Sequence, residues 1–510
     1  MAENKYKNPQ KIVKNTVYLY VRMFIMLVIS LYTSRLVLRE LGITDYGLYN
    51  VIGGLITIFS FINNSMAQAS QRFITYELGK DQPQNLREVF CTCVYIHLLI
   101  AFLIVVLGET VGLWYVYNVA VIPSERFTAA LWVYHCSIIV SCASVITVPY
   151  NALIIGHEHM SAFAYLTIIE AVLKLAIVFL LMVLPFDNLI TYGVLMALLS
   201  ILMRMFYGVY ASRTFPESKL THKINRAYLH SMGGYAGWSL WGSIAAAGYQ
   251  QGLNLLINAF FNPAVNAARG VAITVQAVIK NFSSNFQVAV NPQITKSYAA
   301  GDLTYMHELI YRGSLFSFFL YFVFALPVML EINTLLALWL VDVPQYTSVF
   351  IRILLLISAV EVLASPLNVS AQATGKIKTY EVTISIFLLL IVPIAYVVLL
   401  FWSQPENAFW VFLFQSCLAH FARIILLRKK IGLSVRLYVK LVILKLASVT
   451  IIAAIVPLAI HLSISNEIVR LVCVGLACLI VSPSIVFLFG LSKQEKEVVV
   501  SRVFKFYRKA

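Results

Sequence analysis

Charged side chains lie inside long apolar stretches of this chain, where an unpaired charge is costly. Glu170 and Lys174 are four residues apart near the middle of one such stretch, on one face of the helix that it would form. Neither side chain can readily reach water from that depth, so each needs a partner or a wet cavity. The pair is therefore either a structural ion pair or part of a path for a charged solute.

Most of the other deep charges are cationic. Arg22 and Arg204 lie about 12 Å in from a predicted helix end, where they could either line a cavity or reach back to the interface. Arg269 shares a segment with Lys280, which lies deeper. Glu361 could carry a proton or pair with an arginine of another helix.

A cavity with this cationic bias favours an anionic substrate, and phosphate suits arginine because a guanidinium donates two parallel hydrogen bonds. We therefore predict that the substrate-binding residues are Arg22, Lys174, Arg204, Arg269 and Lys280. The candidates for ion coupling or for pairing inside the cavity are Glu170 and Glu361. Four further cations lie within about two turns of a predicted helix end and should extend to the interface: Arg35, Arg352, Arg423 and Lys445.

Amides and hydroxyls gather in two matching polar stretches, around 63–71 and 281–291, and beside the glycines of the segment 233–260. Such groups avoid lipid, so they either pack helices together or contact a sugar or a headgroup. The predicted polar cavity residues are Asn64, Gln68, Gln250, Gln251, Asn254 and Asn285. The glycines indicate either close packing or a moving element, and the predicted gating residues are Gly237, Gly242 and Gly248.

Composition indicates which elements hold these residues. Of the 510 residues 60% are apolar and 12% are charged, whereas soluble domains average about half apolar and a quarter charged. Apolar runs of roughly 20 residues suit a hydrocarbon core about 30 Å thick. The sequence predicts an all-α polytopic membrane protein of about fourteen transmembrane helices, near 15–38, 46–66, 89–114, 127–149, 160–184, 188–212, 233–260, 264–290, 310–332, 346–371, 379–401, 407–427, 438–461 and 467–490.

The distribution of lysine and arginine between the loops predicts the orientation. Basic residues concentrate at both ends and in the even-numbered loops, such as 213–226 and 428–440, whereas the odd-numbered loops hold Arg39, Arg126 and Arg470. Basic loops stay on the cytoplasmic side, so both termini are predicted to be cytoplasmic. The net charge of +16 follows from this topology and does not indicate nucleic-acid binding. The seven cysteines have no metal-ligand spacing, and we predict no metal site, cofactor or catalytic residue.

The chain also repeats itself at a spacing of about 220 residues. Pro149-Tyr150-Asn151 recurs as Pro366-Leu367-Asn368, each at the exit of the fourth helix of a six-helix lobe. An even number of helices gives both lobes the same orientation. We predict an N-lobe (1–212), a cytoplasmic linker (213–232), a C-lobe (233–430), two additional helices (431–491) and a basic amphipathic cytoplasmic tail (492–510).

These residues resemble a known group of proteins. The segment Leu41-Gly42-Ile43-Thr44-Asp45-Tyr46-Gly47-Leu48-Tyr49 resembles the signature of bacterial polysaccharide flippases, which belong to the multidrug/oligosaccharidyl-lipid/polysaccharide exporter superfamily. The stretch from Pro149 to Lys174, including Glu170, is similar to the fourth-to-fifth helix region of that family. The resemblance covers nearly the whole chain, with its six-plus-six repeat and two extra helices.

The resemblance implies a flippase that moves an undecaprenyl-diphosphate-linked oligosaccharide from the cytoplasmic to the outer leaflet by alternating access. The glycan would serve O-antigen (lipopolysaccharide), capsule or exopolysaccharide biosynthesis at the cell inner membrane. The resemblance also implies a cationic cavity with Arg22 and Arg269 in it, gates at the first and seventh helices, and contacts with membrane lipids and with polysaccharide polymerase machinery. The coupling acids of drug-exporting relatives have no clear match, which leaves H⁺ and Na⁺ both open.

Two alternatives differ in what they require of the sequence. A proton- or sodium-coupled multidrug antiporter of the same superfamily predicts a more acidic cavity. A membrane glycan polymerase or glycosyltransferase needs a large outward loop with catalytic acids or arginines. The longest predicted outward loop, near 332–346, holds only Asp342 as a fully polar acid. We therefore predict a transporter and not an enzyme.

Overall fold

The computed structural model describes residues 9–57, 60–118, 122–221, 225–261, 263–340, 342–491 and 496. The predicted tail 492–510 therefore lies outside the described residues, apart from Lys496. Throughout the described ranges the regular structure is helical, as the composition predicts. The chain divides into two compact units. Unit 1 comprises Met1–Ile244, Val288–Asp302 and Gly375–Lys378, and unit 2 comprises Ala245–Gln287, Leu303–Thr374 and Thr379–Ala510.

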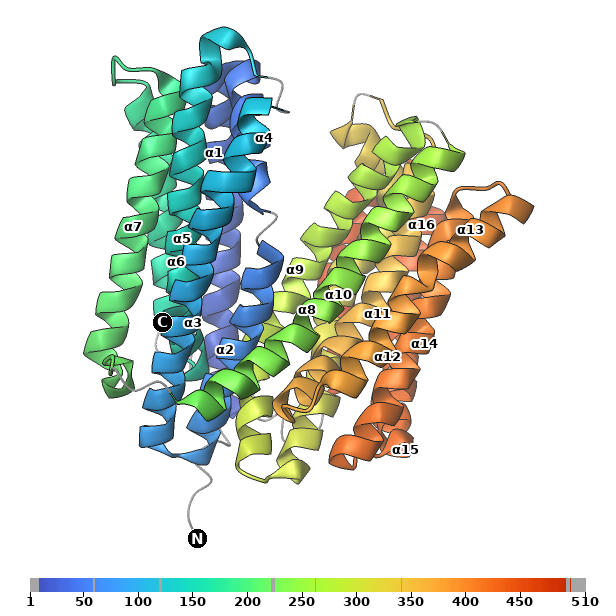
Figure 1. Ribbon diagram of the computed structural model, residues 1–510. Coiled ribbons are helices and arrows are strands. Elements are labelled where there is room, and N and C mark those ends of the chain that lie inside the picture. The colour runs from blue at the N-terminus through green and yellow to red at the C-terminus, as the bar shows by residue number, and fades with distance from the viewer. Residues whose placement is uncertain are drawn as a thin grey trace, which may run out of the picture. The chain divides into compact units, whose positions relative to one another are not determined.

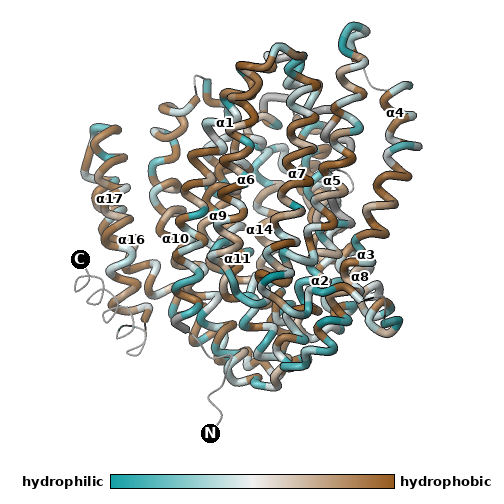
Figure 2. Tube along the Cα trace, turned by 90° about the vertical axis from the view of Figure 1, so that its left-hand side faces the viewer, coloured by the Kyte–Doolittle hydropathy of each residue, from teal (hydrophilic) through white to brown (hydrophobic). Residues whose placement is uncertain are grey.

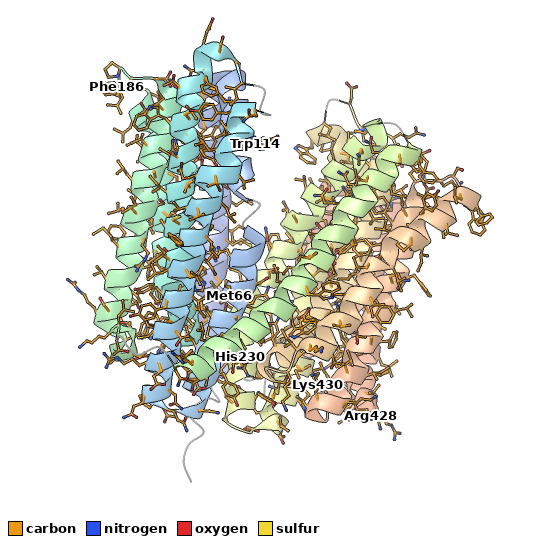
Figure 3. All side chains as sticks on the ribbon, viewed as in Figure 1. Met66, Trp114, Phe186, His230, Arg428 and Lys430 are labelled. Atoms are coloured by element: carbon orange, nitrogen blue, oxygen red, sulfur yellow. The ribbon has the colours of Figure 1, made fainter. Side chains whose placement is uncertain are left out.

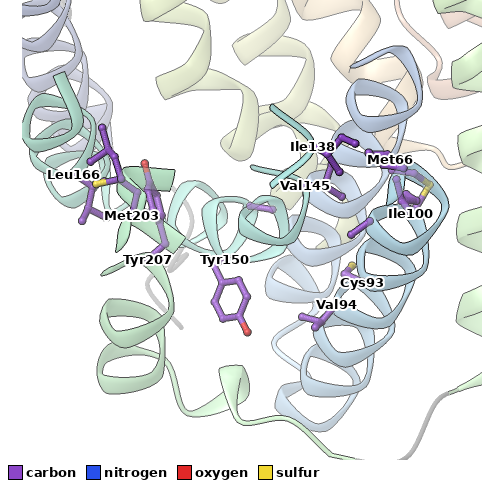
Figure 4. Packing of buried hydrophobic residues seen from close by; sticks show 14 of the residues in the cluster. Met66, Cys93, Val94, Ile100, Ile138, Val145, Tyr150, Leu166, Met203 and Tyr207 are labelled. Carbon is purple, nitrogen blue, oxygen red and sulfur yellow. The ribbon is translucent and has the colours of Figure 1, made fainter. Parts of the chain in front are cut away.

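Unit 1 is built from the first seven helices, the beginning of the eighth and the end of the ninth (Figure 1). Its core joins α5 to α2, α3 and α7, and packs α1 on α6. Figure 4 shows part of this core, where Met203 and Tyr207 of α7 lie beside Leu166 of α6. The elements are α1 (Pro9–Thr57), α2 (Ser60–Lys80), α3 (Pro83–Leu107), α4 (Leu113–Asn118), α5 (Phe127–Gly156), α6 (Met160–Leu181), α7 (Asn188–Thr214) and α8 (Arg226–Phe260).

Unit 2 takes in the later part of α8, most of α9 and the helices that follow. Its core packs α11 against α10 and α14, and α13 against α14. The elements are α9 (Pro263–Ala299), α10 (Leu303–Trp339), α11 (Thr347–Ala373), α12 (Lys378–Leu389), α13 (Ile391–Phe401), α14 (Glu406–Ile431), α15 (Val435–Tyr438), α16 (Lys445–Ser463) and α17 (Glu467–Ile485).

Eleven helical stretches of the described residues are long and apolar enough to cross a membrane, against about fourteen predicted. In Figure 2 the hydrophobic colour runs along α7, α10 and α17. The helices α2, α8 and α9 are long but fall outside this set, because amides, hydroxyls and glycines dilute their apolar residues. The predicted helix 46–66 is divided between the end of α1 and the start of α2. The count of fourteen and the orientation of the termini stay predictions.

The segment that carries the flippase-like signature contains a kink. At Gly42 the backbone of α1 has φ 73° and ψ 170°, and the helix resumes beyond it. This positive φ favours glycine, because a side chain would clash with the backbone there. Three residues later Asp45 pairs with Arg126, whose Nη1 is also 2.5 Å from Asp187 Oδ2. The kink thus brings the signature acid to the start of α5 and the start of α7.

Asp187 also caps the N-terminus of α7, where its Oδ1 accepts hydrogen bonds from the amides of Leu189 and Ile190 at 3.0 Å each. Burial raises the pKa of the Asp187 carboxyl, but the amide of Ile190 and the guanidinium of Arg126 lower it more, so the pKa lies below its usual value.

Exposed Phe186 and Trp114 lie at this end of unit 1, opposite His230 (Figure 3). Large exposed aromatics are typical of a membrane–water interface.

A buried carboxylate fastens the last two long helices to unit 2. Glu331 of α10 is fully buried and interrupts the helical backbone (φ −105°, ψ 22°). His461 Nδ1 of α16 lies 2.7 Å from its Oε1, and Arg470 Nε of α17 lies 3.1 Å from both of its oxygens. The pair α16–α17, predicted as an addition outside the repeat, is thus held to α10 by charge as well as by apolar packing.

We expect Arg470→Gln to destabilise the protein by about 3 kcal/mol, because it leaves the buried carboxylate of Glu331 without its permanent cation. The free energy of unfolding in detergent is the measurement. Arg39→Gln is the matched control, since Arg39 is 67% exposed where it pairs with Glu40 and should cost less than about 1 kcal/mol. Equal effects of the two substitutions would contradict an anchoring role for Glu331.

Candidate functional site

Three of the predicted charged residues of unit 1 lie where α1 packs on α6. Lys174 Nζ lies 2.6 Å from Glu170 Oε1, so the expected pair forms within one helix, with 41% and 34% of the two side chains exposed. The guanidinium of Arg22 lies 4.4 Å from the centre of the Phe163 ring and is close enough to Glu170 to interact with it electrostatically. Arg22 Nε is buried and has no hydrogen-bond partner among the described residues.

Two predicted residues of unit 2 that are far apart in the sequence form an ion pair. Lys280 Nζ of α9 lies 2.6 Å from Glu361 Oε2 of α11. The partner of Glu361 is therefore a lysine, where the sequence suggested an arginine. One turn before Lys280, Gln276 donates a hydrogen bond to Ser358 Oγ at 2.7 Å. The two contacts fasten the middle of α9 to α11.

The third cluster joins three more predicted residues in unit 2. Arg269 near the start of α9 donates from Nη1 to Asn254 Oδ1 (3.1 Å) and from Nη2 to the carbonyl of Gln250 (2.9 Å), both on α8. These neutral acceptors orient the guanidinium without cancelling its charge. Arg269 and Lys280 are about 16 Å apart along the helix, so they lie at different depths.

The ion pairs change the predicted balance of charge. Lys174 and Lys280 are neutralised by glutamates. In the described part of the chain no carboxylate forms an ion pair with Arg22, Arg204 or Arg269. Arg204 instead lies 4.0 Å from the centre of the Tyr150 ring. The cationic character that would attract an anion therefore rests on these three arginines.

A cavity of about 440 Å³ opens beside the later part of α1 and is lined by Tyr32, Arg35, Leu36, Leu38 and Arg39. The sequence predicted that Arg35 extends to the membrane interface, and the structure places it in the lining of this cavity. Arg35 and Arg39 are one turn apart on the same face of the helix. A phosphate group placed there could contact both guanidiniums.

The predicted polar residues are distributed between the two units. In unit 1 Ser239 of α8 donates to Gln68 Oε1 of α2 at 3.4 Å, while Asn64 is exposed. In unit 2 Asn285 Nδ2 donates to the carbonyl of Asn281 within α9 at 2.9 Å, and Gln251 is exposed. Helix packing thus accounts for Gln68, whereas the exposed amides of Asn64 and Gln251 have no hydrogen-bond partner among the described residues.

The glycines of α8 differ in their surroundings. A Cβ on Gly252 would lie 2.6 Å from Val392 Cγ2, so close packing explains that glycine. A Cβ on Gly248 would be in ordinary contact with Leu389, and one on Gly237 would meet no atom within 4 Å. Gly242 lies between them on the same helix. Packing therefore does not explain Gly237, which leaves the gating hypothesis in place for it.

The sequence did not single out Glu158, which lies in the short turn between α5 and α6. Its side chain is 2% exposed and accepts hydrogen bonds from Lys296 Nζ (2.5 Å) and Gln293 Nε2 (2.7 Å), both at the end of α9. Lys11 Nζ of α1 lies 3.5 Å from the same carboxylate. The sequence places Glu158 in the loop between the predicted helices 127–149 and 160–184, and Lys296 in the loop between 264–290 and 310–332. In unit 1 they form a buried ion cluster.

The cations around Glu158 determine its protonation. Burial raises the pKa of this carboxyl, but Lys296 and Lys11 lower it more, so the pKa lies below its usual value. The cluster therefore contributes stability that is present above the ordinary glutamate pKa and is lost as the pH falls through the lower pKa of the folded state. Within the described ranges no group of three or more His, Cys, Asp or Glu residues could hold a metal ion.

We expect Glu158→Gln to lower the free energy of unfolding by about 3 kcal/mol at neutral pH, because Lys296 would stay buried without a counter-charge. The loss should shrink as the pH is lowered, since protonation removes the same charge from the wild type. Glu308→Gln is the control, because Glu308 is 45% exposed where it pairs with Arg312 and should cost less than about 1 kcal/mol. A loss that does not depend on pH would argue against an ionised Glu158.

We expect Lys280→Glu and Glu361→Lys each to impair folding or transport, and the double exchange to restore much of both, because the pair at 2.6 Å is then re-formed with reversed polarity. Protein yield and thermal stability in detergent measure the first effect. If the double variant is as unstable as the sum of the single variants, the two residues do not interact as the structure indicates.

Comparison with solved structures identifies the fold. No family model and no curated protein matches the sequence. The structure is similar to that of a multidrug resistance MATE family transporter of the MOP superfamily in an outward-facing conformation, with a TM-score of 0.71 and 12% identity over 83% of this chain and 95% of that chain.

Two further solved structures show the same likeness. A MOP superfamily transporter from Pyrococcus furiosus has a TM-score of 0.67 and 12% identity over 83% of this chain and 95% of that chain. The MATE transporter ClbM in complex with Rb⁺ has a TM-score of 0.66 and 16% identity over 84% and 96%. The chain therefore has the all-helical, polytopic membrane fold of the MATE transporters of the MOP superfamily.

Proposed function

We propose that this protein is a flippase that moves an undecaprenyl-diphosphate-linked oligosaccharide from the cytoplasmic to the outer leaflet of the inner membrane. The observation that carries the proposal is that Arg22, Arg204 and Arg269 have no carboxylate partner among the described residues, while the lysines beside the deep glutamates are paired. Arginines that keep their charge in an apolar setting suit a diphosphate, which accepts several charge-assisted hydrogen bonds.

In this proposal each arginine contacts the headgroup at a different stage. Arg22 and Arg35 lie about 20 Å apart along α1, so this one helix offers a guanidinium near each side of the membrane. Arg269 is held in place by Asn254 and Gln250 and would contact the diphosphate at a further stage. The sugars would lie against polar groups such as Asn64, Gln251 and Asn285. No covalent bond is made or broken.

The lobes and the termini complete the proposal. Two six-helix lobes would alternate in exposing the headgroup, with the glycines of α8 at the gate and the lipid tail staying in the bilayer. Both termini would be cytoplasmic, and the ion pairs Lys174–Glu170 and Lys280–Glu361 are the candidate positions for coupling to H⁺ or Na⁺. Polysaccharide polymerase machinery would receive the glycan on the outer side.

A cation-coupled multidrug antiporter is the second candidate, because structurally similar proteins include a multidrug resistance transporter and one solved with Rb⁺. Such a transporter would need free acids for a cationic drug. Glu170 and Glu361 each have a lysine within 2.6 Å, which favours the anionic substrate. The similar protein from Pyrococcus furiosus is described as having a binding pocket of reversed polarity that suggests a different function, so the fold accommodates pockets of opposite charge.

We expect deletion of the gene to make complete lipid-linked repeat units accumulate on the cytoplasmic face of the membrane. Arg22→Gln and Arg269→Gln should each reduce export about 10-fold or more at unchanged protein level, since each removes a charged hydrogen bond of about 1.5–3 kcal/mol. Arg213→Gln, at an exposed position near the end of α7, should leave export unchanged.

Three outcomes would contradict this proposal. Accumulation of single repeat units on the outer face would indicate a polymerase. Drug efflux that is stimulated by a sodium or proton gradient, with normal glycan export in the deletion strain, would indicate the antiporter. Export that is unaffected by both arginine substitutions would refute their role at the diphosphate.

A further inference from the structure

Each unit carries an arginine that packs against the exit of a proline-containing helix. In unit 1 Arg204 of α7 reaches α5, and in unit 2 Arg423 of α14 reaches α11. The two arginines are separated by the same spacing of about 220 residues that relates Pro149-Tyr150-Asn151 to Pro366-Leu367-Asn368. The helix pairs α5–α7 and α11–α14 both pack directly. Arg204 and Arg423 thus occupy equivalent positions of the internal repeat.

The two arginines nevertheless have different partners. In unit 2 Arg423 Nε donates to Asn368 Oδ1 at 3.0 Å, and the Tyr380 hydroxyl donates to the same oxygen. In unit 1 the guanidinium of Arg204 lies instead over the ring of Tyr150. Arg204 Nε and Asn151 Oδ1 are both buried without a hydrogen-bond partner among the described residues. The two atoms that would form the equivalent bond in unit 1 are therefore the two that are left unsatisfied.

Two sequence differences between the repeats explain why the bond is missing in unit 1. The residue after the proline is Tyr150 in unit 1 and Leu367 in unit 2, so only unit 1 offers an aromatic face to the guanidinium. One turn after the arginine, unit 1 has Gly208 and unit 2 has Leu427.

Gly208 creates the space in which the Arg204 side chain lies. A Cβ on Gly208 would be 2.6 Å from Arg204 Nη1, which is the far end of a flexible side chain. In unit 2 the equivalent position is occupied by Leu427, which is fully buried. A larger residue at position 208 would therefore displace the guanidinium from its present site.

We propose that Arg204 has two alternative partners, the Tyr150 ring and the side-chain carbonyl of Asn151, and that it moves between them when unit 1 changes conformation. Buried donors and acceptors are normally satisfied, so the unpaired Nε and Oδ1 mark a bond that another state of the protein forms. The bond between Arg423 and Asn368 shows that the repeat can form it. Asn151 is then a positioning residue for Arg204, whatever the transported substance.

A comparison of Asn151→Ala in two backgrounds tests this proposal. In the wild type the substitution removes an acceptor that has no partner, so the unfolding temperature in detergent should change by less than about 1 °C. In the Gly208→Ala background, where Arg204 is displaced toward Asn151, the same substitution should lower it by roughly 2–4 °C. Asn368→Ala is the matched control and should lower it by a similar amount in both backgrounds.

Tyr150→Leu provides a second background that adds no atoms and makes unit 1 resemble unit 2. Asn151→Ala should again cost roughly 2–4 °C there, because the aromatic partner of Arg204 is gone. A cryo-EM structure of Tyr150→Leu should show Arg204 Nε within about 3.2 Å of Asn151 Oδ1. The proposal is overturned if Asn151→Ala has the same effect in all backgrounds, or if Arg204 stays away from Asn151 in that structure.

Discussion

Hydrocarbon offers no hydrogen-bond partner to a charge or an amide, and this constraint organises the structure. Three glutamates of the long helices have a cation within hydrogen-bond distance: Lys174 for Glu170, Lys280 for Glu361, and Arg470 for Glu331. The arginines that lack a carboxylate lie on aromatic rings or neutral amides. The paired glutamates and their cations hold helices together. The arginines on rings and amides keep a charge that no carboxylate of the described residues neutralises, so they can interact with a charged solute.

The sequence predicted individual residues better than their pairing. Lys280 and Glu361 each stood out because charge is rare at membrane depth, but their contact depends on how α9 packs against α11, which hydropathy does not report. Glu158 and Lys296 were missed because the sequence places both of them in loops between predicted membrane helices. What distinguishes them is the low exposure of their side chains, which depends on the folded structure.

The sequence predicts more about the fold than about the substrate. Apolar runs and composition predicted a helical membrane protein, and the resemblance predicted the superfamily whose fold the structure has. Helices were predicted near 233–260 and 264–290, where the structure has α8 and α9, but amides and glycines leave both outside the eleven stretches that are apolar enough to cross a membrane. A shared fold at 12–16% identity carries no substrate with it, so the nature of the cargo rests on the arginines and their surroundings.

The course of α9 has a mechanical consequence. Its middle is joined through Lys280 to α11 of unit 2, and its end is joined through Lys296 to the α5–α6 turn of unit 1. Only about 24 Å of helix, including Pro292, separates the two attachments. Because the helix is continuous between them, any movement of one attachment relative to the other must be absorbed by bending, twisting or detaching this short stretch. The stiffness of this one helical segment would then limit how far Lys280 and Lys296 can move relative to each other, and how readily they return.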